Sequence, residues 1–180
     1  MRYNLTSNGR GLTATGRLLA FDPAAQLEPW TGPAGPPAGF TGPISPGYYP
    51  GDTRTTSEVD DSSSAWQYSP GWLVDMNASS GFYSNTYIHY RDDYGTAQLT
   101  YYGGGFQVLS HTGPNFCDAD IYVGGVYNST VSYYAANPMQ PQILATIQLP
   151  QGLHAIEFRQ KPVAGRVRVV NDGVLLIPKM

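Results

Sequence analysis

The densest cluster of residues that could bind a small ligand is the stretch HYRDDYG at positions 89–95. It combines two tyrosine rings, a guanidinium group and two carboxylates. The apolar C–H faces of sugar rings lie flat on aromatic rings, and sugar hydroxyl groups pair with carboxylate, amide and guanidinium groups. The stretch therefore predicts a glycan-binding loop, although aromatic rings also fill cores and oligomer interfaces. The residues that we predict to contact a glycan are Trp72, Tyr90, Arg91, Asp92, Tyr94 and Tyr133.

The same stretch is a poor candidate for catalysis. Asp92 and Asp93 are neighbours, and neighbours on an extended strand point to opposite faces. Unless the loop bends, they cannot share a proton as a catalytic dyad does. The chain also contains no GxSxG nucleophile motif, no phosphate-binding loop and no HExxH metal motif. We therefore predict that the protein is not an enzyme.

One pair of carboxylates has the spacing of metal ligands. Asp118 and Asp120 point to the same side of a strand and could hold a calcium ion, or they could be solvated carboxylates at a strand edge. His89 and His111 lack the paired spacing of zinc ligands. We expect no cofactor, with calcium at the aspartate pair as the alternative.

The composition favours β-structure and excludes two classes of partner. Of the 180 residues, 14 are tyrosine and only 13% are charged, with a net charge of −3. The chain has no basic cluster, so we expect no nucleic-acid partner. No stretch approaches the roughly 20 apolar residues of a membrane span, and the N-terminus lacks the apolar run of a signal peptide.

From Trp66 onwards, short runs of alternating apolar and polar residues recur between turn signals. In TAQLTYY (96–102) and HAIEFRQ (154–160), the period of two indicates strands with one buried and one solvated face. The turn signals include the three glycines at 103–105 and Gly124-Gly125, and Asn171-Asp172-Gly173 is a hairpin signal. We predict an all-β, antiparallel jelly-roll β-sandwich with strands near 72–76, 86–90, 97–102, 106–110, 119–123, 129–134, 142–147, 152–159, 166–171 and 174–177.

The first third of the chain has a different character. In residues 29–51, 13 of 23 positions are proline or glycine. The stretch SEVDDSSSAW at 57–66 is polar and acidic, and we predict that it is a loop. We predict an extended N-terminal arm over residues 1–64, which serves in assembly or anchoring, and the sandwich over 65–180. Large side chains among the prolines would dock into grooves as anchors. These predicted anchors are Trp30, Phe40, Ile44, Tyr48 and Tyr49.

Four motifs follow one another in a familiar order: GWLVDM, DYGTAQLTYYGGGFQVLS, ADIYVGGVYNSTVSYY and LPQGLHAIEFRQ. In this order they resemble the galactose-binding-like jelly-roll modules, a type of carbohydrate-binding module. Such modules occur beside glycosidases and on viral, including phage, capsid and tail proteins. The resemblance covers residues 66–177. It departs from the family pattern at Val123-Gly124-Gly125, where these modules carry Val-Asp-Gly.

Two functions are consistent with these features. The first is a structural surface protein of a virion or similar assembly, such as a capsid decoration, spike or tail protein. It would be anchored by its arm and would pair with itself, as in a trimer, and with other subunits; its sandwich could bind cell-surface glycans. The alternative is a non-catalytic carbohydrate-binding module of a secreted glycosidase. Both place the protein on a virion surface or outside the cell, without a classical signal peptide.

Overall fold

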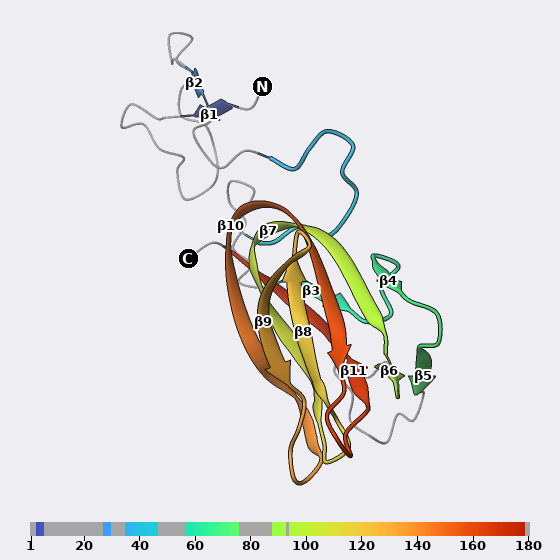
Figure 1. The fold of residues 1–180 in the computed structure, drawn as a ribbon. Coiled ribbons are helices and arrows are strands. Elements are labelled where there is room, and N and C mark those ends of the chain that lie inside the picture. The colour runs from blue at the N-terminus through green and yellow to red at the C-terminus, as the bar shows by residue number, and fades with distance from the viewer. Residues whose placement is uncertain are drawn as a thin grey trace. The chain divides into compact units, whose positions relative to one another are not determined.

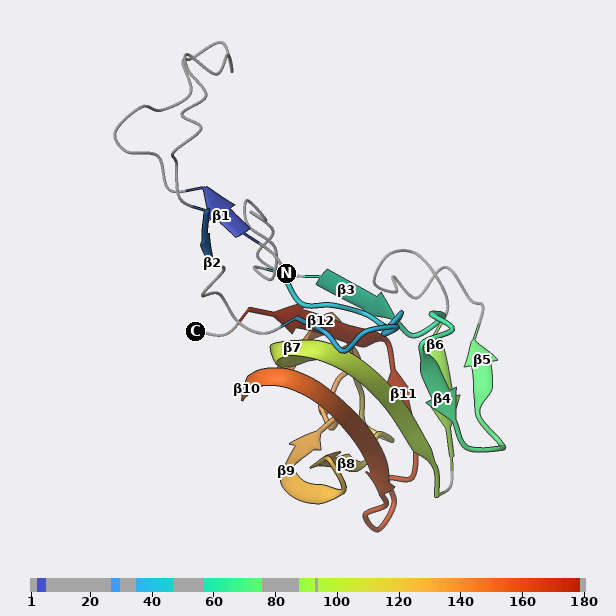
Figure 2. The same ribbon diagram turned by 90° about the horizontal axis from the view of Figure 1, so that it is seen from above.

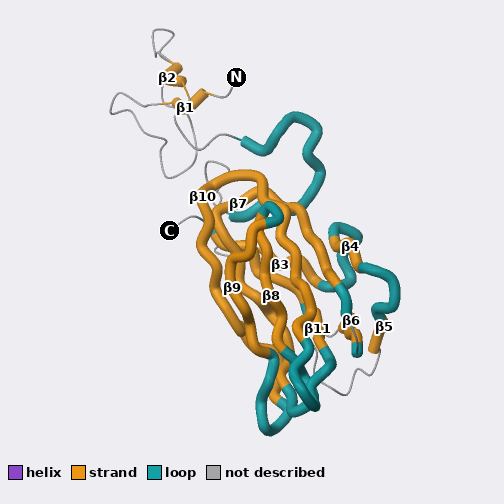
Figure 3. The backbone as a smooth tube through the Cα atoms, in the orientation of Figure 1, coloured by secondary structure: helices purple, strands orange, loops and turns teal. Residues whose placement is uncertain are grey.

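The computed structural model describes residues 3–5, 27–29, 35–46, 57–75, 88–92 and 94–178. The chain divides into two units, Met1–Ala34 and Gly35–Met180. The described residues form strands, turns and loops (Figure 3), and they contain no helix that could cross a membrane. The strands are β1 (Tyr3–Leu5), β2 (Leu27–Pro29), β3 (Ser57–Asp60), β4 (Trp66–Tyr68), β5 (Leu73–Asp75), β6 (Ile88–Arg91), β7 (Thr96–Thr112), β8 (Asp118–Val123), β9 (Val126–Ser132), β10 (Met139–Lys161), β11 (Val169–Asn171) and β12 (Gly173–Ile177).

The pairing of two long strands organises the unit of residues 35–180. β7 has 17 residues and β10 has 23, and they run antiparallel from Thr96 opposite Arg159 to Thr112 opposite Met139. Three register shifts interrupt this ladder. Such shifts bend strands and increase their twist, and Figure 2 shows β7 and β10 curving side by side.

The curved strands carry different partners along their length. The order in the seven-stranded sheet is β3-β12-β7-β10-β8-β9, with β4 also paired to β7, and β11-β6-β5 form a second sheet (Figure 1 and Figure 2). Phe106 in the second half of β7 meets Phe158 in the second half of β10, with ring centres 6.2 Å apart. The two halves of the bent sheet therefore face each other across one core. This confirms the predicted all-β, antiparallel sandwich.

The core is apolar and rich in aromatic rings. Tyr101, Phe106, Ile121 and Leu176 are completely buried, and Trp66 packs on Phe158 with ring centres 5.9 Å apart. Alternation along the strands produces this core: in β7, positions 97, 99 and 101 point inward, and 98 and 100 are exposed. The alternation in TAQLTYY therefore gives one buried and one solvated face, as predicted.

A segment of the proline-rich region completes the edge of β7. On the side away from β10, β4 covers the start of β7 and β12 covers positions further along. Ile44 forms a parallel bridge to Tyr102 between them. The Ser45 N–H donates to the Tyr102 carbonyl at 2.8 Å, and the Tyr102 N–H donates to the Pro43 carbonyl at 3.0 Å. Without this segment, backbone groups in the middle of β7 would lose their partners.

The structure divides the chain at a different place from the sequence prediction. The compact unit begins at Gly35 rather than at residue 65. The acidic stretch that we predicted as a loop contains β3, a turn over residues 61–65 and the first residue of β4. β3 pairs with β12 from Ser57 opposite Leu176 to Asp60 opposite Gly173. The anchoring role of the residues before Gly35 stays a prediction.

Several strand boundaries differ from the predictions. The strands predicted at 97–102 and 106–110 are one strand, β7, and those predicted at 142–147 and 152–159 are joined in β10. Asn171-Asp172-Gly173 is no hairpin, because β11 pairs with β6 while β12 pairs with β3 and β7. This tripeptide instead carries the chain from one sheet into the other.

Glycine permits the close approach of segments at the middle of β7. A Cβ on Gly103 would overlap Ser45 Oγ, and one on Gly105 would lie 2.5 Å from the Ile147 carbonyl oxygen. The three glycines that read as a turn signal therefore continue the strand and make room for its neighbours on both sides.

We expect truncation to distinguish the two parts of the proline-rich region. Residues 35–180 should unfold cooperatively with nearly the stability of the whole chain. Residues 61–180 should lose several kcal/mol or fail to fold. This truncation removes the buried Val59, for which burial contributes about 1.5–3 kcal/mol, and backbone hydrogen bonds of about 1 kcal/mol each. Urea unfolding followed by circular dichroism measures both, and equal stability of the two fragments would contradict this account.

Gly103 and its cross-strand partner Gly152 provide a matched comparison. Gly103→Ala should destabilise the protein by about 1–3 kcal/mol, because its Cβ would overlap Ser45 in a packed interior. Gly152→Ala should be nearly neutral, since the closest atoms to its Cβ belong to His154 at 3.8 Å or more. Thermal unfolding of both variants tests this, and similar melting temperatures would show that Ser45 yields at little cost.

Candidate functional site

The predicted loop presents one exposed ring and one engaged carboxylate. Tyr94 is 76% exposed. Asp92 accepts two hydrogen bonds from Arg168, at 2.6 and 2.8 Å, and this pairing lowers the pKa of the Asp92 carboxyl. Both Asp92 oxygens are therefore occupied by a residue 76 positions away in the chain.

The other predicted glycan contacts are placed less favourably. Tyr133 is 2% exposed and belongs to the core, so its prediction as a stacking ring is corrected. Trp72 is half-buried against Tyr68, and its indole N–H donates to the Thr96 carbonyl at 3.1 Å. Tyr90 and Arg91 lie on β6, and their side chains are outside the described part of the structure.

Two predicted anchors lie on the sandwich of their own chain. Ile44 is half-buried in its bridge to Tyr102, and Phe40 is half-buried beside Gly42. The other three lie outside the described residues: Trp30, Tyr48 and Tyr49.

The aspartate pair predicted as a calcium candidate is occupied by protein groups. Asp118 accepts a hydrogen bond from the Ser132 hydroxyl at 2.8 Å. Asp120 accepts from Thr130 and from the Lys161 ammonium at 3.0 Å. Within the described residues, no three histidine, cysteine or acidic side chains are grouped so that they could hold a metal ion.

A stronger candidate site lies on the outer side of the sheet, where β4, β7, β10, β8 and β9 run side by side. The register places one residue from each strand in a row across the sheet, each opposite the next. We call this row, together with Arg159, Asp118, Asp120, Thr130 and Lys161 beside it, the polar sheet face. Neighbouring strands are about 4.8 Å apart, so the row spans about 19 Å. In order, the row is Gln67, Gln98, Glu157, Tyr122 and Tyr127.

Hydrogen bonds and ring contacts connect the centre of this row. Glu157 accepts from the Gln98 amide at 3.2 Å and from Arg159 Nε at 2.6 Å. The Arg159 guanidinium lies 3.7 Å above the centre of the Tyr122 ring, and its bond to Glu157 raises the pKa of Arg159. Tyr122 then meets Tyr127 edge to face, with ring centres 5.8 Å apart. One amide, one ion pair and two rings therefore hold one another in place.

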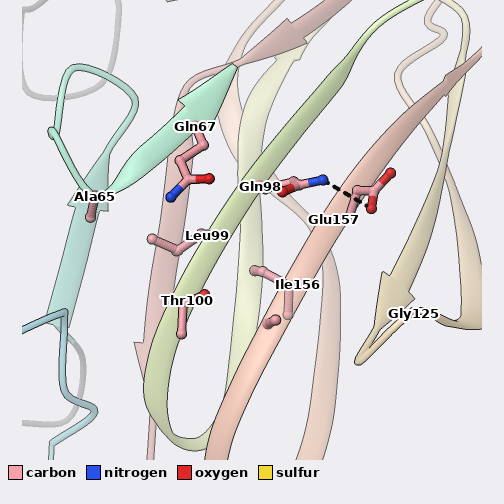
Figure 4. Close-up of a pocket in the computed structure, with 9 residues that line it drawn as sticks. Ala65, Gln67, Gln98, Leu99, Thr100, Gly125, Ile156 and Glu157 are labelled. Atoms are coloured by element: carbon pink, nitrogen blue, oxygen red, sulfur yellow. Dashed lines mark hydrogen bonds between the residues drawn. The ribbon is translucent and has the colours of Figure 1, made fainter. Parts of the chain in front are cut away.

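A shallow pocket opens beside the amide end of the row. It has a volume of about 140 Å³ and lies over Leu99 and Ile156, which belong to the core (Figure 4). Ligand pockets for drug-sized molecules measure about 300–1,000 Å³, so this pocket suits a single ring or chain unit at the surface. The other residues that line it are Ala65, Gln67, Gln98, Thr100, Gly125, Ala155 and Glu157.

The next part of the face is a second linked group of polar side chains. The Tyr127 hydroxyl lies 3.0 Å from Thr130 Oγ1, and Thr130 donates to Asp120, which also binds Lys161. Burial alone would raise the pKa of Asp120, but the hydrogen bonds from Thr130 and Lys161 outweigh this effect and lower it. Tyr127 remains 53% exposed, so part of its ring is accessible to a ligand.

Sequence reasoning missed this site because its residues are far apart in the chain. The signal was present in the alternation, where Gln98, Glu157 and Arg159 occupy the solvated positions of predicted strands. The missing information was the register, which brings position 98 opposite position 157.

The comparisons with known proteins add no family. Neither the protein-family models nor the curated proteins gave a match. Among solved structures, the fold is similar to the Agl-KA catalytic domain, with TM-score 0.48 and 16% identity over 71% of this chain and 28% of that one. It is also similar to a cycloisomaltooligosaccharide glucanotransferase from Paenibacillus sp., complexed with cycloisomaltoheptaose, with TM-score 0.40 and 17% identity over 67% and 18%. The chain spans less than a third of either protein, and at TM-scores below 0.5 neither likeness carries a functional argument.

Proposed function

We propose that the protein is a non-catalytic glycan-binding β-sandwich and that the polar sheet face is its binding surface. The observation that carries this proposal is the cross-strand row, which places two amides, a carboxylate and two tyrosine rings in line. Aromatic rings and planar polar groups on a rigid scaffold are the two components that a sugar-binding surface needs.

The rigidity of the face supports binding over catalysis. Gln98 and Arg159 are both held by Glu157, and Arg159 covers one side of Tyr122. A ligand therefore meets side chains that are already ordered, which reduces the entropy lost on binding. The surface is shallow, so we expect a dissociation constant of about 0.1–1 mM per site, corresponding to about −4 to −5.5 kcal/mol. Several copies on one particle would raise the apparent affinity through effective concentration.

We expect substitutions on the sheet face to reduce glycan binding more than a substitution in the loop. Tyr127→Ala and Gln98→Ala should each weaken binding about tenfold, which corresponds to about 1.4 kcal/mol. Tyr94→Ala removes a more exposed ring from the HYRDDYG loop and should leave affinity unchanged. A polysaccharide panel of dextran, xylan, laminarin and soluble starch, followed by affinity electrophoresis, identifies the ligand and compares the variants.

A different outcome would assign the site elsewhere. Loss of binding in Tyr94→Ala alone would favour the loop, and the absence of binding to any glycan in the panel or on an array would count against a glycan-binding function. Thermal unfolding of each variant shows whether a loss of binding reflects a loss of fold.

A second candidate function is assembly on a virion surface or a similar extracellular particle, with the chain as a homo-oligomer. The observation that favours it is the division of the chain into two units, of which Met1–Ala34 is the smaller. A unit that is distinct from the main domain of its chain can serve to contact another subunit. The two proposals are compatible, because an assembled particle would present many glycan-binding faces.

Assembly is measured by comparing the whole chain with residues 35–180. If residues 1–34 direct assembly, light scattering on a sizing column should give an oligomer for the whole chain and a monomer for the fragment. A monomer in both cases, across a hundredfold range of concentration, would argue against self-assembly through this segment.

A further inference from the structure

We infer that the ligand of the polar sheet face is an uncharged polysaccharide, lying across the strands along the row from Gln67 to Tyr127. This inference rests on the proposed function and deepens it by naming the class of ligand. It depends on two features of the face: how its charges are paired, and how its uncharged groups are arranged.

The cations of the face are engaged by its own carboxylates. Arg159 contacts Glu157 at 2.6 Å, and Lys161 contacts Asp120 at 3.0 Å. Asp118 adds a third carboxylate, so the face has two cations, three anions and a net charge of −1. An acidic chain would meet a slight excess of like charge and would have to displace a carboxylate to reach either cation.

The uncharged groups lie on a path that crosses the strands. The row begins at two amides beside the pocket and ends at two tyrosines, with the ion pair between them. A ligand that ran along β10 instead would meet Glu157, Arg159 and Lys161 in succession, since these positions share the outer face. A neutral chain therefore gains amide bonds and a ring contact only if it crosses the strands.

Glu157 has a positioning role in this arrangement. Its carboxylate accepts from Gln98 on one side and from Arg159 on the other. It therefore orients the amide and neutralises the guanidinium at the same time. Replacing Glu157 with glutamine removes the charge that holds Arg159, changes the net charge of the face from −1 to 0, and leaves a partly exposed cation available.

The experiment compares neutral and acidic polysaccharides on the whole chain and on Glu157→Gln. Dextran, xylan and laminarin serve as neutral probes, and polygalacturonate and alginate as acidic probes. The wild-type protein should bind a neutral probe at least about tenfold more tightly than either acidic probe. Raising the ionic strength from about 0.1 M to about 1 M, which shortens the Debye length from about 10 Å to about 3 Å, should leave that binding unchanged.

Glu157→Gln should change the preference. Its binding to the neutral probe should weaken, and salt-sensitive binding to polygalacturonate should appear. Glu58→Gln on β3 is the control, because it changes the net charge of the protein equally at a residue outside the polar sheet face. Circular dichroism melting curves confirm that both variants are folded.

The outcomes distinguish a failure of the neutral-ligand inference from a failure of the proposed glycan-binding function. Salt-sensitive binding of wild-type protein to polygalacturonate or alginate overturns the neutral-ligand inference and leaves a glycan-binding function standing. The neutral-ligand inference is also overturned, and a glycan-binding function still stands, if Glu157→Gln and Glu58→Gln bind the acidic probes alike. If the wild-type protein binds none of the probes, neutral or acidic, the proposed function fails and the inference fails with it.

Discussion

The ladder between β7 and β10 is the interaction on which the rest of the structure depends. These strands hold 17 and 23 residues, far more than the usual five or six. A flat pair of this length could not enclose a core, so the pair must bend. The register shifts and the glycines at the middle of β7 supply this bend, and Phe106 is thereby brought against Phe158. Every other strand of the seven-stranded sheet then extends one side of the bent pair.

A bent strand of this length has a long edge, and one neighbouring strand does not cover it. The structure covers the edge of β7 with β4, the segment around Ile44, and β12, which come from distant parts of the chain. Proline suits the middle position because only a few backbone bonds are needed there, and Pro43 contributes its carbonyl, which is the one hydrogen-bonding group its backbone has. The proline-rich region is therefore partly structural, whatever residues 1–34 contribute.

The local patterns predicted the fold class, while the long-range pairings could not be obtained from them. Alternation in TAQLTYY and HAIEFRQ identified the buried faces, and Gly124-Gly125 is a turn, with φ of 57° and 80°, between β8 and β9. Gly103–Gly105 and Asn171-Asp172-Gly173 misled the prediction for a common reason. Each has the composition of a turn, but tertiary packing uses it for close approach and for a change of sheet.

The candidate site also depends on long-range pairings that local sequence patterns do not show. HYRDDYG is a dense local cluster, and sequence proximity alone makes it a predicted site. In the structure both Asp92 oxygens bind Arg168, and the linked polar row lies on other strands. A row across five strands has no local signature, since each strand contributes one residue. What makes the row a single surface is the chain of contacts from Gln98 through Glu157 and Arg159 to Tyr122. In a sandwich, the register that closes the core on one side of a sheet also fixes which side chains meet on the other side. The same ladder that buries Leu99 and Ile156 therefore sets the spacing of the surface above them.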